Sequence, residues 1–466
     1  MKREIEGRPF VLFAAGLIIA TACIYSLTNL IFLVLVFCLL ADLSAKRVSK
    51  AQWIFVAGCL VALIRPPVVA GPSLLETKPF AGQVDLLSMP DDGQSRQRVL
   101  ASTEHGRVIL SATKRTEMSL GDRVYVVGDL RPLNEASEPR ERARGAYAEL
   151  RAITVTPIDR GGWLFRQGLA MRRSFVEFVG THLDPRAAAV VDAVCFNQDA
   201  ELTPETTDAL RRTGTIHIIS TSGLHVMLLA YLVHAGLGVL PIPRKGQVFI
   251  LIVLLFLYAA AAGFRAPAVR ASLMASMLSF AYLVAREPDP ISALAASSVG
   301  ILLLAGTEHV LDLGFQISFI VVGSLVLAVH AWRDPPEAFL PMLWDRLKQG
   351  AMASVLAWLA SIPIIAYHFG QISLIAVPSN LLVGFAIPFI IGFALSGWLV
   401  AKLNLAIGLG FLLPAQFLSG YLLAVVDVLG SFRYAAMVTP PFSGYWLPAL
   451  YGVALILWRP LARAAP

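Results

Sequence analysis

Long apolar runs alternate with one polar region along this chain, and the two patterns predict a membrane protein with an inserted β domain. Residues 10–41 are apolar except for the interruption Ser26–Asn29, and residues 53–69 form a shorter apolar run. A helix needs about 20 apolar residues to cross the hydrocarbon layer. The first run is therefore expected to form two short helices in a hairpin, so that residues 1–70 hold three membrane helices.

Residues 71–162 show a different pattern, in which apolar and polar residues alternate with the period of half-buried strands. Turn pairs such as Asp92-Gly93 and Gly121-Asp122 separate the short segments. Five strands in about ninety residues predict a small β-barrel. The expected strands are Phe80–Leu87, Gln97–Ser102, Arg107–Ala112, Arg123–Leu130 and Tyr147–Pro157.

Nine further apolar runs predict that residues 187–466 form a transmembrane domain, for a total of about 12 membrane segments. Pro267, Pro363, Pro378 and Pro388 are expected to kink or break helices, so some segments are predicted to be broken or re-entrant. The runs lie near residues 216–240, 247–264, 268–285, 291–306, 310–331, 352–367, 373–400, 405–429 and 444–458.

A separate helix is predicted between the β domain and this transmembrane domain, over residues 163–186. Aromatic and aliphatic residues of Trp163–Leu183 recur at helical spacing, with Arg166, Arg172 and Arg173 on the other side. This amphipathic pattern is typical of a helix lying in the membrane interface. A connector packed on the helix bundle explains it equally well.

Composition excludes a soluble globular protein. Of the 466 residues, 57% are hydrophobic and only 15% are charged, and the mean hydropathy is +0.69, which is far from the balance of soluble domains. The four cysteines form no pair that predicts a disulfide or a metal clip. We therefore expect a polytopic α-helical membrane protein with no cofactor.

Lysine and arginine placement predicts the orientation, because cytoplasmic segments of membrane proteins carry an excess of these residues. Lys2, Arg3 and Arg8 precede the first apolar run, and residues 46–50 after the second contain three more. The N-terminus is thus expected in the cytoplasm and the β domain outside it. A cleaved signal peptide over residues 1–27 competes with this interpretation, but no convincing small-residue cleavage site follows.

One membrane run is unusually polar. The segment 210–230, LRRTGTIHIISTSGLHVMLLA, holds two histidines, five Ser or Thr hydroxyls and two glycines. Polar side chains at that depth are costly and usually functional, so the segment is expected to line water, a ligand or another helix.

Residues 209–230, ALRRTGTIHIISTSGLHVMLLA, resemble the signature of the ComEC-type competence proteins, which form the inner-membrane channel for DNA uptake in transformable bacteria. Three further blocks agree in order: GFRAPAVRASLMASM at 263–277, LDLGFQISF at 311–319 and SIPIIAYHFGQISLIAVPSNLLVGF at 361–385. GDRVYVVGDLRPLNE at 121–135 is similar to the family's extracytoplasmic OB-like domain. The resemblance implies a bacterial inner-membrane channel that imports single-stranded DNA.

Many members of the family also carry a metallo-β-lactamase-like domain after the membrane core. This sequence stops at Pro466, and its eight histidines include no HxH pair, the close ligand spacing of a dinuclear metal centre. We therefore expect no metal site and no nuclease activity in this chain, and we predict that it is not an enzyme.

The resemblance further implies an extracytoplasmic DNA receptor and a cytoplasmic ATPase motor as partners, and leaves DNA degradation to a separate nuclease. No GxxxxGK[ST] sequence is present, so a motor has to be another protein. Membrane lipids complete the expected partners.

Moving a polyanion through hydrocarbon requires a hydrated path lined by hydrogen-bond donors. Candidates for this path or its gate are hydroxyl, imidazole and guanidinium side chains, one small residue and two amides. They are His217, Ser220, Thr221, Ser222, Gly223, His225, Arg265, Arg270, Gln316 and Asn380.

Simpler roles compete for each candidate. Small and hydroxylated residues often only bring helices close together, and His217 and His225 share a helix face only if the segment between them stays helical. Arg265 and Arg270 are expected either as interior donors or as side chains that reach the interface. Gln316 is expected to hydrogen-bond with Asp312.

Asn380 is expected to cap a broken helix, with DNA contact as the lesser alternative. The β domain offers few aromatics for stacking bases, namely Phe80, Tyr125 and Tyr147, and its thirteen basic and thirteen acidic residues balance. DNA guidance and a purely structural role both remain open for it.

Two other functions compete with the DNA channel as interpretations of the sequence. An intramembrane serine hydrolase would use Ser222 beside Gly223, but the GxSG pattern needs glycine at position 220, where this chain has serine. A small-solute transporter would use broken helices and midplane polar groups, yet no inverted repeat or carboxylate pair is evident.

Overall fold

The computed structural model describes residues 74, 76–92, 96–113, 116–134, 138–143, 145–196, 202–219, 223–304, 312–329 and 339–464. The three expected N-terminal membrane helices lie outside these residues. The chain divides into two units, which are described separately. The first comprises residues up to Gln167 and Pro243–Gln316, and the second comprises Gly168–Ile242 and Ile317–Pro466.

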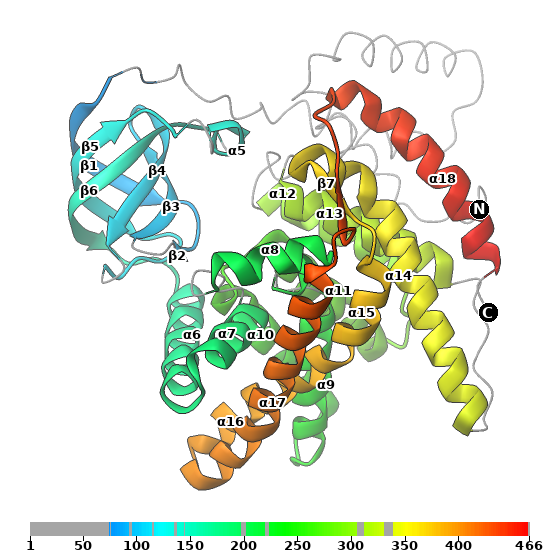
Figure 1. Ribbon diagram of the computed structural model, residues 1–466. Helices are drawn as coiled ribbons and strands as arrows, with labels where there is room; N and C mark the ends of the chain where they lie inside the picture. Colours follow the sequence, from blue (N-terminus) through cyan, green and yellow to red (C-terminus); the bar gives the residue numbers. More distant parts are fainter. Residues whose placement is uncertain are drawn as a thin grey trace, which may run out of the picture. The chain divides into compact units, whose positions relative to one another are not determined.

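The first unit contains a six-stranded mixed sheet (Figure 1), and all five predicted strands are present in it. One short strand was not predicted, because Asp92 was assigned to a turn with Gly93. The strands are β1 Lys78–Leu86, β2 Asp91–Asp92, β3 Arg96–Thr103, β4 Gly106–Thr113, β5 Arg123–Arg131 and β6 Ala146–Asp159.

Alternation along the strands determines which side chains form the core. Every second residue of β3 and of most of β5 is buried, because successive side chains of a strand point to opposite faces. Val84, Val99, Val126 and Leu150, from four different strands, belong to one cluster of buried side chains.

Strand pairing in this sheet returns to its starting point. β1 pairs with β5, β5 with β6, β6 with β4 in parallel, and β4 with β3. β3 then pairs with β1 through Asp85–Ser102 and Leu86–Ala101. Five strands therefore form a closed circuit, and only the two-residue β2 remains as an edge.

A buried carboxylate fixes the chain where it leaves this sheet. Asp122 accepts hydrogen bonds from the Ser119 amide at 2.7 Å and from the Gly161 amide at 2.5 Å. It thus joins the turn before β5 to the segment after β6. At the far side of the sheet, helix α5 (Glu138–Ala143) contributes Glu141, whose Oε1 lies 3.7 Å from Nη2 of Arg98 on β3.

Apolar helices complete the first unit. α10 and α11 form a hairpin, and Ser272 of α11 donates to the Leu255 carbonyl of α10 at 3.2 Å. α12 packs on α11, and Pro267 lies in the first turn of α11, where a missing N–H costs nothing. The helices are α10 Arg244–Ala261, α11 Ala266–Leu283, α12 Pro290–Leu304 and α13 Leu313–Val329, which begins in this unit.

The second unit is helical, with one small two-stranded sheet. Each predicted apolar run of this unit contains a helix, although the run at 216–240 starts with the short 3₁₀ helix η1 and its described α-helical part is Gly223–Gly238. The elements are α6 Trp163–His182, which begins before the unit boundary, α7 Pro185–Phe196, α8 Pro204–Arg212, η1 Ile216–Ile218, α9 Gly223–Gly238, α14 Phe339–Phe369, β7 Gln371–Ser373, α15 Ala376–Gly384, α16 Ala386–Ala401, α17 Leu405–Ser431, β8 Ala436–Val438, η3 Gly444–Trp446 and α18 Leu447–Ala464.

The prolines do not end helices at their own positions, although the run at 373–400 is broken as expected for some segments. Pro363 lies inside α14 without ending it, since that helix runs for 31 residues. Pro378 and Pro388 occupy the first turns of α15 and α16, where proline is tolerated. The break between these helices is at Phe385, and Tyr421 donates its hydroxyl to the Leu382 carbonyl there at 3.1 Å.

Helix α6 differs from the amphipathic pattern expected for it. Arg172 was placed on the polar side but is buried, together with Leu169, Phe175 and Val179. Phe175 packs edge-on against Phe196 of α7, at 4.9 Å between ring centroids. The face that carries Arg172 therefore packs inside the unit.

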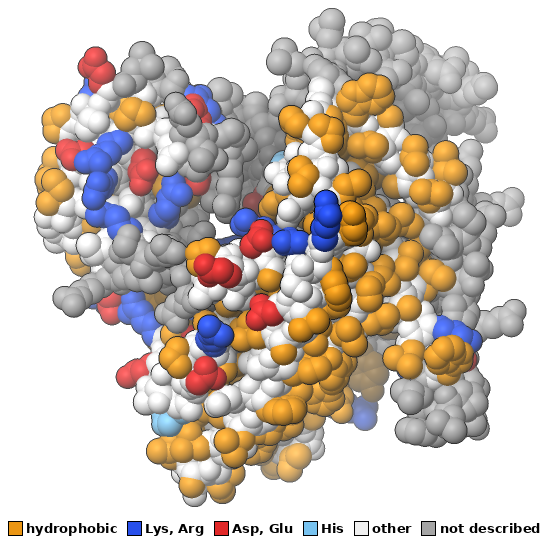
Figure 2. Space-filling view, viewed as in Figure 1, with side chains coloured by type: hydrophobic (Ala, Val, Ile, Leu, Met, Phe, Trp, Pro, Cys, Tyr) orange, Lys and Arg blue, Asp and Glu red, His pale blue; other side chains and the backbone are white. Residues whose placement is uncertain are grey.

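Among the residues that the structure describes, four helical segments are long and apolar enough to cross a membrane: Arg244–Ala261, Trp344–Phe369, Ala376–Ala401 and Leu405–Ser431. Their outer faces are apolar, as Leu413 and Phe417 of α17 show with exposed fractions of 70% and 76%. In Figure 2 hydrophobic side chains cover the visible surface of α17, whereas basic and acidic side chains mix over the β sheet. The chain is a membrane protein with an additional, polar-surfaced β domain.

Candidate DNA-path residues

The polar signature segment is not one helix. α8 ends at Arg212, a turn follows at Thr213 and Gly214, and the short η1 precedes α9. Thr213 and Thr215 are completely buried, with their hydroxyl oxygens 2.7 Å apart. Thr213 also donates to the Ala209 carbonyl at 2.8 Å. These hydroxyls close α8 and fix the turn.

Gly214 brings this turn against a distant part of the chain. Its φ is +72°, and a Cβ built on it would lie 2.7 Å from the Cβ of Ala376 and 2.9 Å from that of Ser373. Two of the blocks singled out in the sequence, 209–230 and 361–385, therefore meet in the second unit. Gly214 was not among the predicted site residues, although glycine beside a helix end is a signal for positive φ.

The two histidines lie on different elements. His217 is exposed on η1, with Nδ1 3.1 Å from the Gly214 carbonyl oxygen. His225 is buried on α9. The condition for a shared helix face, continuous α-helix between them, is not met because Ile216–Ile218 form the 3₁₀ helix η1 and Ile219 lies in a turn. Gly223 is the first described residue of α9 and is half-buried. Ser220, Thr221 and Ser222 lie outside the described residues.

Asn380 is not a helix cap. It lies inside α15, whose N-cap is Ile375, and its Nδ2 donates to Ser354 of α14 at 3.3 Å. Its Oδ1 and the Oγ of the neighbouring Ser379, which is completely buried, have no hydrogen-bond partner in the described part of the chain. Two successive residues of α15 thus each bury a polar atom without a hydrogen bond.

Trp358 connects α14 to this region. Its Nε1 donates to the Ser373 carbonyl oxygen at 3.0 Å, and the Ser373 side chain faces Gly214. Ser373 also donates to the Ala435 carbonyl at 3.5 Å. One residue of β7 therefore joins α14, the α8–η1 turn and the strand region at Ala435.

The remaining described candidates belong to the first unit. Arg265 is half-buried at the start of α11. Arg270, one and a half turns further, is 3% exposed, with Nη1 3.4 Å from Sδ of Met274. The burial of this guanidinium fits the alternative of an interior donor.

The turn that precedes these arginines has an unusual backbone. Phe264 has φ +52°, a conformation that non-glycine residues rarely adopt. Its ring packs edge-on against Phe165 at 5.1 Å between centroids. Phe165 lies in the first turn of α6, so the start of α6 contacts the α10–α11 turn.

Gln316 follows the start of α13. Asp312 accepts from the Phe315 amide at 3.0 Å through Oδ1, and the Gln316 amide donates to the Asp312 carbonyl at 3.0 Å. Asp312 therefore caps α13. The hydrogen bond from the Gln316 amide to the Asp312 carbonyl thus connects the two residues through their backbones.

The β sheet presents one exposed aromatic among the three considered. Tyr147 is 9% exposed and belongs to the core, Phe80 is half-buried, and Tyr125 is 42% exposed. Arg123, on the same outward face of β5, binds Asp85 at 2.7 Å, and this hydrogen bond and the carboxylate charge raise its pKa.

Arg96 has a structural role in the sheet. It joins β3 to β6 by donating to the Ala152 carbonyl at 2.8 Å, and burial lowers its pKa. Basic and acidic side chains alternate across the visible face (Figure 2). Among the described residues, no group of His, Cys, Asp and Glu is arranged to hold a metal ion.

A protein-family model described as "Competence protein" matches residues 194–463, more than half of the chain. The chain belongs to the competence protein family. All four sequence blocks lie within the match: 209–230, 263–277, 311–319 and 361–385. This confirms the family resemblance.

Two curated relatives agree. The "ComE operon protein 3" of Bacillus subtilis (strain 168) is 30% identical over 244 residues, covering 52% of this chain and 30% of the relative. The "Competence protein ComA" of Neisseria gonorrhoeae is 27% identical over 401 residues, covering 77% of this chain and 53% of the relative. The chain thus spans about half or less of the relatives it matches. No solved structure matches it.

Proposed function

We propose that this competence-family protein forms a channel for single-stranded DNA in the bacterial inner membrane during natural transformation. The family match across residues 194–463 carries the proposal. The packing of Gly214 on Ala376 and Ser373 supports it, because it joins two of the matching blocks at a polar region between apolar helices. Buried polar groups within membrane helices commonly mark a substrate pathway.

The path that we propose uses the candidate residues in different ways. Arg270 and His217 offer donors to phosphate oxygens, and Asn380 offers a side-chain amide. Scattered donors suit transport, since a translocating strand has to be released as well as bound. Arg265, Gln316 and the signature residues Ser220–Gly223 and His225 complete the proposed path or gate.

The β domain, residues 71–162, is proposed to be an OB-like barrel on the extracytoplasmic side. Its circuit of five paired strands, with one parallel pair, supports this proposal, because an OB fold is a five-stranded, partly open Greek-key barrel. We propose the remaining organisation as membrane helices over 1–70, a connector over 163–186 and a channel domain over 187–466, with about 12 membrane segments in all and the N-terminus in the cytoplasm.

Transport of a polyanion needs an energy source and a supply of substrate. We therefore propose three partners: a DNA receptor outside the membrane, an ATPase motor in the cytoplasm and a separate nuclease. In this proposal the chain itself conducts the strand and catalyses no reaction.

The experiment is uptake of labelled DNA by cells that carry the intact gene, a deletion, or point variants at matched membrane abundance. DNA that is protected from external nuclease and reaches the cytoplasm is measured. His217→Ala is compared with His234→Ala, which replaces an exposed histidine of α9. We expect uptake to be lost in the deletion, to fall at least tenfold in His217→Ala and to persist in His234→Ala.

Uptake that continues in the deletion strain would refute the channel. Loss in the deletion with equal uptake in the two histidine variants would retain the channel and remove His217 from the path. Arg270→Ala against Arg270→Lys then tests the buried positive charge, and we expect only the lysine variant to keep measurable uptake.

A further inference from the structure

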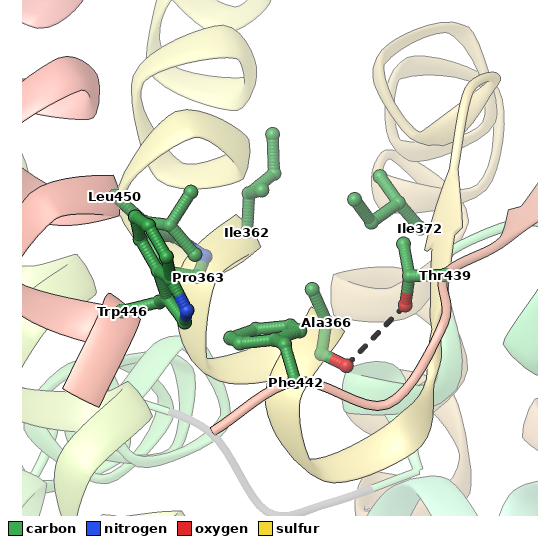
Figure 3. Close-up of a pocket in the computed structure, with 8 residues that line it drawn as sticks. All are labelled: Ile362, Pro363, Ala366, Ile372, Thr439, Phe442, Trp446 and Leu450. Carbon is green, nitrogen blue, oxygen red and sulfur yellow. Dashed lines mark hydrogen bonds between the residues drawn. The ribbon is translucent and has the colours of Figure 1, made fainter. Parts of the chain in front are cut away.

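An apolar cavity lies in the second unit. Its volume is about 320 Å³, and it is partly open to the outside between α14, β7 and the segment that leads into α18 (Figure 3). Its lining residues are apolar except for one threonine: Ile362, Pro363, Ala366, Ile372, Thr439, Phe442, Trp446 and Leu450.

The polar groups of the one threonine that lines the cavity are hydrogen-bonded within the protein. Thr439 donates its hydroxyl to the Ala366 carbonyl at 3.4 Å and its amide to the Gly370 carbonyl at 2.8 Å. In Figure 3 this hydroxyl points to Ala366, at the edge of the cavity. The cavity therefore offers no free polar group to a ligand or to water.

Such a cavity selects hydrocarbon. Because the cavity is partly open, its apolar lining is accessible to surrounding hydrocarbon. Its volume lies at the small end of the range of ligand sites, about 300–1,000 Å³. A narrow chain of methylene groups fits that volume and lining.

The exposed surface of α18 indicates the route by which a hydrocarbon chain would reach the cavity. Trp446 and Leu450 line the cavity, and Val453 and Leu457 continue the same helical face with exposed fractions of 55% and 51%. An exposed apolar helix face of a membrane protein contacts lipid, and tryptophan favours the level of the lipid headgroups. A continuous apolar track thus leads from the lipid-facing side of α18 into the cavity.

We propose that this cavity binds one acyl chain of a membrane phospholipid. The chain enters along α18 and fills the space between Pro363 of α14 and Ile372 of β7. Occupancy holds α18 against α14 and supports the β7–β8 pairing, whose other side contacts the α8–η1 turn through Ser373.

The test uses the full-length protein in nanodiscs that contain phosphatidylethanolamine with a photoactivatable diazirine on one acyl chain. After illumination, labelled peptides are mapped by mass spectrometry. We expect labelling of the Phe442–Leu450 peptide to saturate as the probe fraction rises, whereas labelling at Leu413 on α17 should rise in proportion to it. Saturation marks a site, and proportionality marks ordinary surrounding lipid.

Ala366→Phe fills the cavity, and Ala406→Phe makes the same change at an exposed position of α17. The first should reduce labelling of the cavity peptide at least tenfold, and the second should leave it unchanged. Ile372→Phe repeats the test if Ala366→Phe does not fold. Proportional labelling in the wild type, or labelling that survives a folded cavity-filling variant, would overturn the site.

Discussion

Gly214 lies so close to Ala376 that a Cβ atom on the glycine would stand 2.7 Å from the alanine Cβ. Two parts of the competence signature, far apart in sequence, are thus in direct contact. The contact requires a residue without a side chain, and its φ of +72° independently favours glycine. Strand β7, just before Ala376, has Ser373 facing the Gly214 turn and Ile372 lining the apolar cavity.

Gly214→Ala is expected to destabilise the second unit by about 2–4 kcal/mol, because it adds the cost of a left-handed conformation to that of overpacking. Titration with SDS from mild detergent micelles measures the free energy of unfolding. Gly236→Ala is the matched control, since nothing lies within 4 Å of a Cβ at that position. Equal effects of the two variants would show that the Gly214 contact is not present in the protein.

Trp358→Phe removes the hydrogen bond from Nε1 to the Ser373 carbonyl while keeping an aromatic ring. We expect a loss of about 1–2 kcal/mol, the value of one partly buried hydrogen bond and the smaller ring. Trp344→Phe, on the exposed part of the same helix, should change stability by less than about 0.5 kcal/mol. The same SDS titration compares them, and the reverse order would contradict the assigned bond.

Helices α16 and α17 approach closely at Gly408. A Cβ there would lie 2.5 Å from the Ala401 Cβ and 2.6 Å from its Cα, so backbone would have to move. Gly408→Ala should cost about 1–3 kcal/mol. Gly410→Ala, two residues further along α17 and facing open space, should be neutral or stabilise the helix by about 0.5–1 kcal/mol. Thermal unfolding of the detergent-solubilised protein, monitored by its aggregation, ranks the two variants.

Asp122→Ala leaves the Ser119 and Gly161 amides without their acceptor. Because the carboxylate is 8% exposed, the expected loss is about 1–3 kcal/mol. Hydrogen exchange should accelerate at both amides. Asp85→Ala breaks only the exposed pair with Arg123, and exposed ion pairs contribute little, so exchange of the Ser119 and Gly161 amides should stay slow. Slow exchange in Asp122→Ala would reject its role.

Local patterns predicted most of the elements. Alternation placed all five main strands, and the nine apolar runs of the last two-thirds each contain helix, because burial of one face imposes its own period. Prolines were harder to interpret: Pro363 lies within α14 and Pro378 within the first turn of α15. Whether a proline breaks a helix depends on its distance from the helix start, which the sequence alone locates poorly.

The environments of single polar residues were less predictable. Arg172 was expected on a polar face and is buried, and Asn380 was expected as a cap and lies inside α15. Each outcome depends on which helix packs against that face. A neighbour such as Ser354 of α14, which accepts from Asn380, leaves no trace in the local sequence.

The sequence by itself determined that this is a membrane protein of the competence type with an inserted β domain, because hydropathy and strand period are properties of neighbouring residues. Only the tertiary structure decided that β1 closes its circuit by pairing with β3 as well as β5, and that Gly214 packs on Ala376. Both contacts join segments separated along the chain, and their geometry follows from how apolar faces pack together. Periodicity identifies such faces but does not say which of them meet.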